Sequence, residues 1–120
     1  MIAPSPSRLA FTAHERDTLL VLGYLHLEQR RPAEAAVLLR PLHRAYPEDG
    51  EVERCLALAE LSAGYVERAA VLAAHAYPLA EAPDRKAMGL IYAKALWLIG
   101  DEEGARGVFT KILAPGENSL

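Results

Sequence analysis

The sequence predicts an all-α fold, built as a stack of three helical hairpins with six helices. Between Leu19 and Pro47, apolar residues recur at helical spacing on both sides of a break at 30–32, which indicates two antiparallel helices. Ala35-Ala36 recurs 34 residues later as Ala69-Ala70, and Ala105 follows after 36 more. Because one hairpin cannot bury its own apolar face, such units stack, and about three are needed for stability.

The first hairpin has clear start and stop signals. Thr12 and Glu15 have the spacing of a capping box, and the helix that they open extends to about Gln29. Pro32 stands at the first position of the second helix, where its missing N–H costs nothing. That helix stops before Pro47, since the residue before a proline disfavours the helical conformation. One face of the first helix carries residues at helical spacing: Leu19, Leu22, Gly23 and His26.

The second and third hairpins follow the same plan. Asp49 is placed to cap a helix over about 50–63 that ends at Gly64, and its paired helix runs over about 66–76. Two residues more than the ideal repeat predict an irregular connection over 77–83. After it, Asp84 is expected to cap the helix that ends at Gly100, and Asp101 to cap the last helix. A small residue in the first helix of each hairpin allows its partner helix to approach closely: Gly23, Ala57 and Ala93.

The predicted domain covers residues 12–114, with a flexible segment over 1–11 and a frayed tail over 115–120. The most membrane-like run, 87–100, has only fourteen residues and Lys94 in its middle, whereas a bilayer core needs about twenty. The start of the chain lacks the apolar core of a secretory signal. We therefore expect a cytoplasmic protein.

Composition and side-chain spacing argue against nucleic acid binding and catalysis. The net charge is −3 with no basic cluster, whereas phosphate binding needs several cations on one surface. The four histidines and the single cysteine, Cys55, lack metal-ligand spacing, and Cys55 is expected to be a small buried residue. Glycines near Gly100 lack the strand and the Lys-Ser/Thr of a phosphate loop, and Glu102 and Glu103 fit a helix start. We expect no catalytic, metal or cofactor site, and hence a binding module.

The order of small and large residues in each hairpin resembles the tetratricopeptide repeat, and the fold that this implies is a short right-handed α-solenoid. The second unit departs from the pattern, because it has Ala73 where Leu39 and Phe109 stand in the others. In tetratricopeptide proteins the first helix of each unit lines the concave side. The resemblance therefore implies a partner-binding concave face at nine positions: Leu20, Tyr24, Leu27, Arg54, Leu58, Leu61, Leu90, Lys94 and Trp97.

Seven of these nine residues are apolar or aromatic, and a soluble monomer seldom leaves so long an apolar stripe in water. We expect the stripe to receive a partner's amphipathic helix, with a second copy or a terminal helix of this chain as the other occupants. Tetratricopeptide proteins that clamp a terminal carboxylate use inward Lys, Arg and Asn. The only asparagine here is Asn118, near the end of the chain, which excludes that class.

A narrower resemblance covers about Phe11 to Leu113. The segments LLVLGYLHLEQ, AEAAVLLRPL, ERCLALAEL and LIGDEEGARGVF resemble the small type III secretion chaperone called YscY or SctY. The resemblance implies a non-catalytic cytoplasmic chaperone that binds and stabilises the secreted protein SctX as a heterodimer, and with it engages the export-gate protein SctV. Chaperones of needle or translocator subunits, and a self-assembling tetratricopeptide scaffold, stay open as alternatives.

Overall fold

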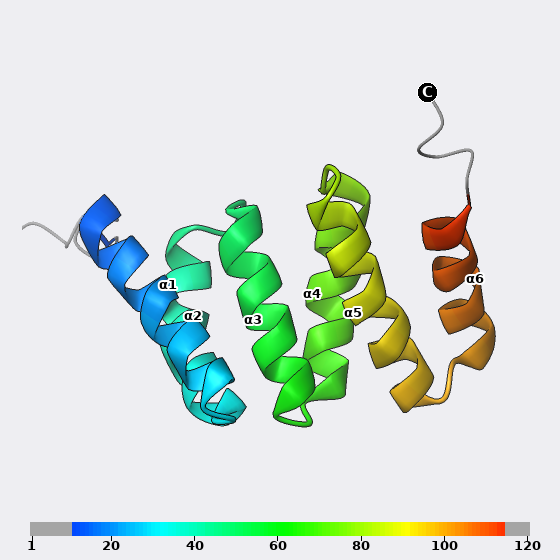
Figure 1. Cartoon of the computed structure of the whole chain (residues 1–120), viewed down its shortest axis with the longest axis horizontal. Helices are drawn as coiled ribbons and strands as arrows, with labels where there is room; N and C mark the ends of the chain where they lie inside the picture. Colours follow the sequence, from blue (N-terminus) through cyan, green and yellow to red (C-terminus); the bar gives the residue numbers. More distant parts are fainter. Residues whose placement is uncertain (1–10, 115–120) are drawn as a thin grey trace, which may run out of the picture.

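The computed structural model describes residues 11–114, and within them the chain is all-helical, as predicted (Figure 1). Six α-helices follow one another, with a short 3-10 turn between the fourth and the fifth. Their bounds are α1 (Ala13–Glu28), α2 (Pro32–Ala45), α3 (Gly50–Ser62), α4 (Val66–Ala76), η2 (Tyr77–Leu79), α5 (Asp84–Ile99) and α6 (Glu102–Leu113). The predicted irregular connection over 77–83 is confirmed, since it holds the 3-10 turn and the bend before α5.

The helices form three hairpins, α1–α2, α3–α4 and α5–α6, and each helix packs against the next one along the chain. α3 also contacts α1, and α5 also contacts α3, so the first helices of the three hairpins lie side by side. The result is an elongated row of helices with extents of 55 × 32 × 27 Å (Figure 1). We call the side formed by α1, α3 and α5 the inner face. The second helices, α2, α4 and α6, lie on the other side of the row.

Helix ends follow the local chemistry of the sequence at three of the four predicted caps. The Glu15 amide donates to Thr12 Oγ1 at 3.1 Å, and the Thr12 amide donates to Glu15 Oε1 at 2.9 Å, which confirms the capping box. Asp49 accepts from the first amides of α3, and Asp101 accepts from the Gly104 amide at the start of α6.

The cap predicted at Asp84 is wrong. α5 begins at Asp84 itself, with Pro83 at the cap position and no side-chain hydrogen bond to the first turn. The Pro83 carbonyl already accepts from the Lys86 amide at 3.1 Å, so the first turn is closed one residue earlier than the sequence suggests. The Asp84 carboxylate does not cap the helix and instead lies 3.8 Å from Nε of Arg54 on α3.

Two clusters of buried side chains lie along the row, one at each contact between hairpins. The first joins α1 and α2 to α3 and contains the larger residues: Leu20, Ala35, Ala36, Leu39, Leu42, Val52, Cys55, Leu56 and Ala59. The second joins α3 and α4 to α5 and is richer in alanine: Ala57, Leu61, Ala69, Ala73, Ala76, Met88, Ile91 and Ala95. Leu72 packs against both clusters, so the two parts of the core meet at this residue.

The small residues that marked the hairpins in the sequence lie where helices approach closely. A Cβ placed on Gly23 would lie 3.0 Å from the methyl carbons of Leu39 on α2, and Ala35 and Ala69 are fully buried. Gly64 and Gly100 end α3 and α5 with positive φ, a conformation that glycine adopts without strain. The prediction of Cys55 as a small buried residue is also confirmed.

The limits of the packed unit can be compared with the prediction only in part. Residues 1–10 of the expected flexible segment, and the expected frayed tail 115–120, lie outside the described residues. Phe11 belongs to the packed unit, because its side chain lies against the first cluster and its carbonyl accepts a hydrogen bond from the Tyr46 hydroxyl. The described domain therefore begins one residue before the predicted boundary.

Candidate protein-binding surface

The inner face carries the nine residues that the repeat pattern assigned to partner binding, but it exposes only some of them. Leu20 and Leu61 are 4% and 8% exposed, so the expectation that these two line an open stripe is wrong. Leu20 is buried beneath α3, in the first cluster, and Leu61 is buried beneath α5, in the second cluster. In each of the two cases, the first helix of the following hairpin contributes residues to the cluster that buries the leucine.

Tyr24, Arg54 and Asp84 form a polar connection across α1, α3 and α5. Nη2 of Arg54 lies 3.4 Å from the Tyr24 hydroxyl, and Nε of Arg54 lies 3.8 Å from a carboxylate oxygen of Asp84. Burial raises the pKa of the Tyr24 hydroxyl, and the charge of Arg54 offsets part of that rise. Two of the predicted binding residues, Tyr24 and Arg54, therefore contact one another across the first two hairpins, and Arg54 also lies near Asp84 of the third.

The remaining inner-face residues differ in how far they reach water. Leu27 is half-buried against the first cluster, whereas Leu58 lies exposed at the middle of α3. Leu90, Lys94 and Trp97 are exposed along α5, and half of the Trp97 side chain faces solvent. The exposed apolar surface thus grows from α1 toward α5.

A hollow of about 420 Å³ lies where α5 meets α6, and it brings Leu90, Lys94 and Trp97 together. Its other lining residues are Ala93 of α5 and, from α6, Ala105, Arg106 and Phe109. We call this hollow the C-terminal socket. Its walls are apolar, two cations stand at it, and Trp97 and Phe109 leave about half of their surface exposed. Such a site is suited to an apolar side chain that has an acidic residue beside it.

Sequence reasoning missed Arg106 and Phe109 as surface residues. The repeat pattern placed Phe109 only at the position of Leu39 in the first hairpin. Leu39 is fully buried, since it lies against Gly23 of α1 and shares a cluster with residues of α3, whereas no helix follows α6 within residues 11–114 to cover Phe109. The exposure of Phe109 could have been predicted from its place in the last of the three predicted hairpins.

A second hollow, of about 410 Å³, lies on the other side of the row between α2 and α4. It is lined by Arg40, His43, Arg44, Leu56, Glu60, Glu67, Arg68, Val71 and Leu72. Nη2 of Arg40 lies 2.7 Å from the buried carboxylate of Glu60, and this ion pair raises the pKa of the guanidinium. The guanidinium groups of Arg40 and Arg68 also lie within 5.4 Å and 5.2 Å of the Tyr65 ring centre. This surface is more polar at its rim than the inner face.

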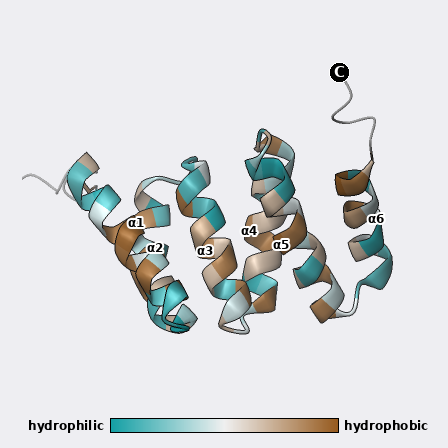
Figure 2. Ribbon diagram, viewed as in Figure 1, coloured by the Kyte–Doolittle hydropathy of each residue, from teal (hydrophilic) through white to brown (hydrophobic). Residues whose placement is uncertain are grey.

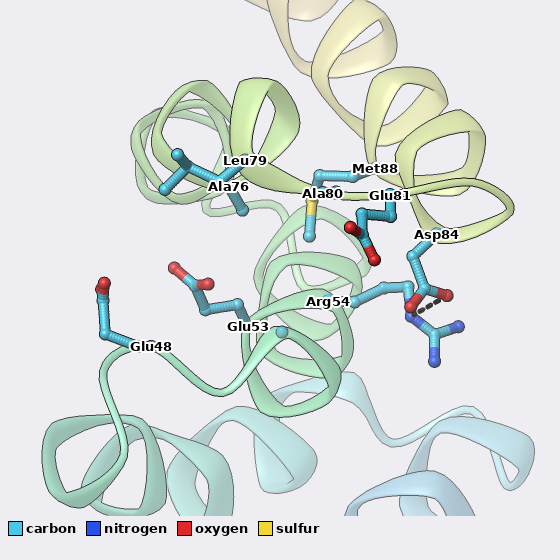
Figure 3. Close-up of a pocket in the computed structure, with 10 residues that line it drawn as sticks. Glu48, Glu53, Arg54, Ala76, Leu79, Ala80, Glu81, Asp84 and Met88 are labelled. Carbon is cyan, nitrogen blue, oxygen red and sulfur yellow. Dashed lines mark ion pairs between the residues drawn. The ribbon is translucent and has the colours of Figure 1, made fainter.

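A third hollow, of about 350 Å³, has mixed polar and apolar walls and lies between the start of α3 and the connection from α4 to α5 (Figure 3). Arg54 and Asp84 face one another on one side of it, and Glu53 and Glu48 lie on the other (Figure 3). Glu53 is not free, because its carboxylate lies 3.0 Å from Nδ1 of His75 on α4. Among residues 11–114, no group of three or more His, Cys, Asp or Glu side chains is placed to hold a metal ion.

None of the helices described here is both long enough and apolar enough to cross a bilayer. In the comparisons with known proteins, no protein-family model matches the chain, and no curated protein matches it. The hairpin stack and the surfaces that it leaves open are the observations that bear on function.

Proposed function

We propose that the protein is a non-catalytic binding module, a chaperone of the type III secretion system that covers the apolar helix of a protein partner on its inner face. The observation that carries the proposal is the exposure of four apolar side chains on α3, α5 and α6, which are Leu58, Leu90, Trp97 and Phe109; the last three line the C-terminal socket together. Monomeric proteins seldom leave a contiguous surface of this kind in water unless it meets a partner.

The chemistry of this surface favours a helix as the ligand. Exposed side chains at Leu90, Lys94 and Trp97 follow one another at spacings of four and three along α5, which forms a groove wall that an amphipathic helix can match. Lys94 and Arg106 add positive charge at the socket, so we expect acidic residues beside the partner's apolar anchors. The resemblance to SctY makes a SctX-type secreted protein the first partner to test.

The same proposal places the chaperone in the bacterial cytoplasm and, once it carries SctX, at the export gate SctV. Chaperones of a needle or translocator subunit differ from it in the cargo rather than in the binding surface. Co-purification from the native host, followed by mass spectrometry of the bound protein, separates these cargoes. Recovery of a SctX-type protein supports the proposal. Recovery of a needle or translocator subunit would instead identify the protein as the chaperone of that subunit.

The Leu58→Asp variant tests the inner face directly. Leu58 is exposed at the centre of the row, so the helices should form as before. The carboxylate would be buried without a counter-charge under a bound helix, and the loss of a central anchor adds to that cost, so binding should fall by at least tenfold. The measurement is a pull-down of co-expressed partner, with helix content checked by circular dichroism.

Val71→Asp is the matched control, because Val71 is exposed on α4 on the other side of the row. It should retain the partner at the level of the unmodified protein. If Leu58→Asp retains the partner and Val71→Asp loses it, the inner face is not the binding surface. The hollow between α2 and α4 would then be the better site.

A further inference from the structure

The two contacts between hairpins use the same helix positions. In each contact, the first helix of the following hairpin inserts residues at i, i+3, i+4 and i+7 against the hairpin before it. These residues are Val52, Cys55, Leu56 and Ala59 on α3, and Met88, Ile91, Tyr92 and Ala95 on α5. Seven of the eight are buried and Tyr92 is half-buried, so this face of a first helix is built to be covered.

α1 carries the same face but exposes it. The corresponding positions are Thr18, Val21, Leu22 and Leu25. Val21 is 56% exposed, and within residues 11–114 no hairpin stands before α1 to cover this face. α1 carries apolar residues on more than one side, and its ribbon is brown over the middle turns (Figure 2). We call these four residues the α1 outer face. A helix that is apolar all round is normally buried.

The C-terminal socket is the other side of the same kind of contact. It has the residue positions that receive a following first helix, but no such helix is present within residues 11–114. Trp97 stands at the position of Leu61, and Phe109 stands at the position of Leu39. Leu61 is buried beneath α5 and Leu39 beneath α3, whereas Trp97 and Phe109 are about half exposed. The socket is therefore shaped for the first helix of another hairpin.

The charges near these two surfaces are also complementary. At the first contact, Nη2 of Arg16 on α1 lies 2.8 Å from Asp49 and 3.1 Å from Glu51 at the start of α3. Lys86 on α5 stands at the position of Arg16 in the third hairpin, and Glu15 and Asp17 stand at the positions of Asp49 and Glu51 in the first hairpin. Placing α1 after the third hairpin would bring Lys86 to these two carboxylates.

We propose that the C-terminal socket binds α1 of a second copy of this chain, so that copies associate head to tail and continue the stack of hairpins. Two cations depart from the internal contacts: Arg106 stands at the position of Ala36 and Ala70, and Lys94 stands at the position of Tyr24 and Leu58 and is exposed. Arg106 is the larger change. Its guanidinium points to Glu102 at 3.7 Å and is exposed, so the stem can lie along α1 while the charge stays in water. This inference does not rest on the proposed chaperone function.

Head-to-tail association joins two different surfaces, so each added copy leaves a new socket open and the assembly does not stop at two. Sedimentation velocity of the full chain over a range of concentrations measures this property. Val21→Glu disables the α1 outer face, and Phe109→Glu disables the socket. Both residues are about half exposed, and Leu25→Lys and Trp97→Lys are the replacements if either variant loses helix content. Val37→Glu is the control, on the exposed side of α2.

The unmodified protein and the Val37→Glu control should grow beyond dimers as concentration rises. Each disabled variant alone should stay monomeric. A 1:1 mixture of Val21→Glu and Phe109→Glu should form dimers and nothing larger, because one variant supplies the only intact socket and the other supplies the only intact α1 outer face. The emission of Trp97, the single tryptophan, should shift to shorter wavelength in that mixture.

Three results would overturn the inference. The first is an unmodified protein that, with no partner present, stays monomeric at the highest concentration reached, in which case the socket is left to a partner protein alone. The second is an assembly that stops at a dimer, which indicates a symmetric interface. The third is a mixture of the two disabled variants that remains monomeric although both are folded.

Discussion

The first inter-hairpin contact and the C-terminal end of the stack use equivalent residues, yet one is closed and the other open. Leu39 and Phe109 occupy the same position in their hairpins, and their exposed fractions are 0% and 46%. The larger of the two side chains is the exposed one. At this repeat position the exposed fraction therefore follows whether another hairpin packs on, and the size of the apolar side chain does not decide it.

The polar groups at the two places differ as well. The first contact contains an ion pair between Arg40 of α2 and Glu60 of α3, and Glu60 is only 2% exposed. Thr110 stands at the position of Arg40 on α6, at the open end. Loss of either partner would leave a buried charge unpaired, so the stability of the first contact depends on which residues face each other more than that of the open end does.

Among changes to polar groups, helix crossings and caps, the largest expected effect comes from breaking that ion pair. Arg40→Met leaves the Glu60 carboxylate buried without its counter-charge, which should lower the free energy of unfolding by about 3 kcal/mol. Urea denaturation followed by circular dichroism measures it. Replacing both residues, as Arg40→Met with Glu60→Leu, should recover most of the loss. A single variant as stable as the unmodified protein would show that Glu60 is reached by water.

Overpacking the hairpin crossings should have the next largest effect. Ala35 and Ala69 are fully buried where paired helices meet, so leucine at either position should cost about 1–3 kcal/mol. In a stack this short, the loss should extend to the neighbouring hairpin. Thermal melting measures it, and Val37→Leu is the control because Val37 is exposed. Unchanged melting temperatures for both alanine variants would place the repeat boundaries elsewhere.

Alkaline pH should weaken the first contact through Cys55. Burial raises the pKa of its thiol from 9.0 to about 11. The folded protein binds that proton more tightly than the unfolded chain, so the stability is complete below pH 9 and is lost as pH rises through 11. At pH 10 the loss should be on the order of 1 kcal/mol. Cys55→Ala should remove this contribution, and identical alkaline profiles for the two proteins would contradict it.

The smallest expected effect is at the open end. Asp101 accepts a hydrogen bond from the Gly104 amide at 2.9 Å and caps α6. Asp101→Ala should cost about 1 kcal/mol and should increase amide hydrogen exchange in α6 more than in α2. Glu103→Ala is the control at an exposed residue in the same turn that caps nothing. Equal exchange in both helices would mean that α6 does not depend on its cap.

Local signals in the sequence were sufficient to predict the helices. The Thr12–Glu15 capping box, Pro32, Gly64 and Gly100 act through their own turns, so their roles needed no knowledge of distant residues. Asp84 failed as a cap because the Pro83 carbonyl already closed the turn, a detail of geometry that the residue types do not reveal.

The surface was harder to predict because it depends on contacts between hairpins. The repeat pattern placed all nine residues on the first helices, but Leu20 and Leu61 are covered by the hairpins that follow them. The same pattern aligned Phe109 with Leu39, but within residues 11–114 no hairpin follows to cover Phe109. Residues in a repeat have the same position in each unit, but the two ends of the array give them different neighbours.

The matched pair Leu39→Ala and Phe109→Ala tests the central claim most directly, since the two residues share one repeat position and differ in whether a hairpin covers them. Thermal and urea unfolding at low protein concentration, where copies do not associate, give both free energies. Leu39→Ala should cost about 2–5 kcal/mol and Phe109→Ala less than about 1 kcal/mol. Equal losses for the two variants would contradict the claim that the C-terminal end is an open inter-hairpin contact.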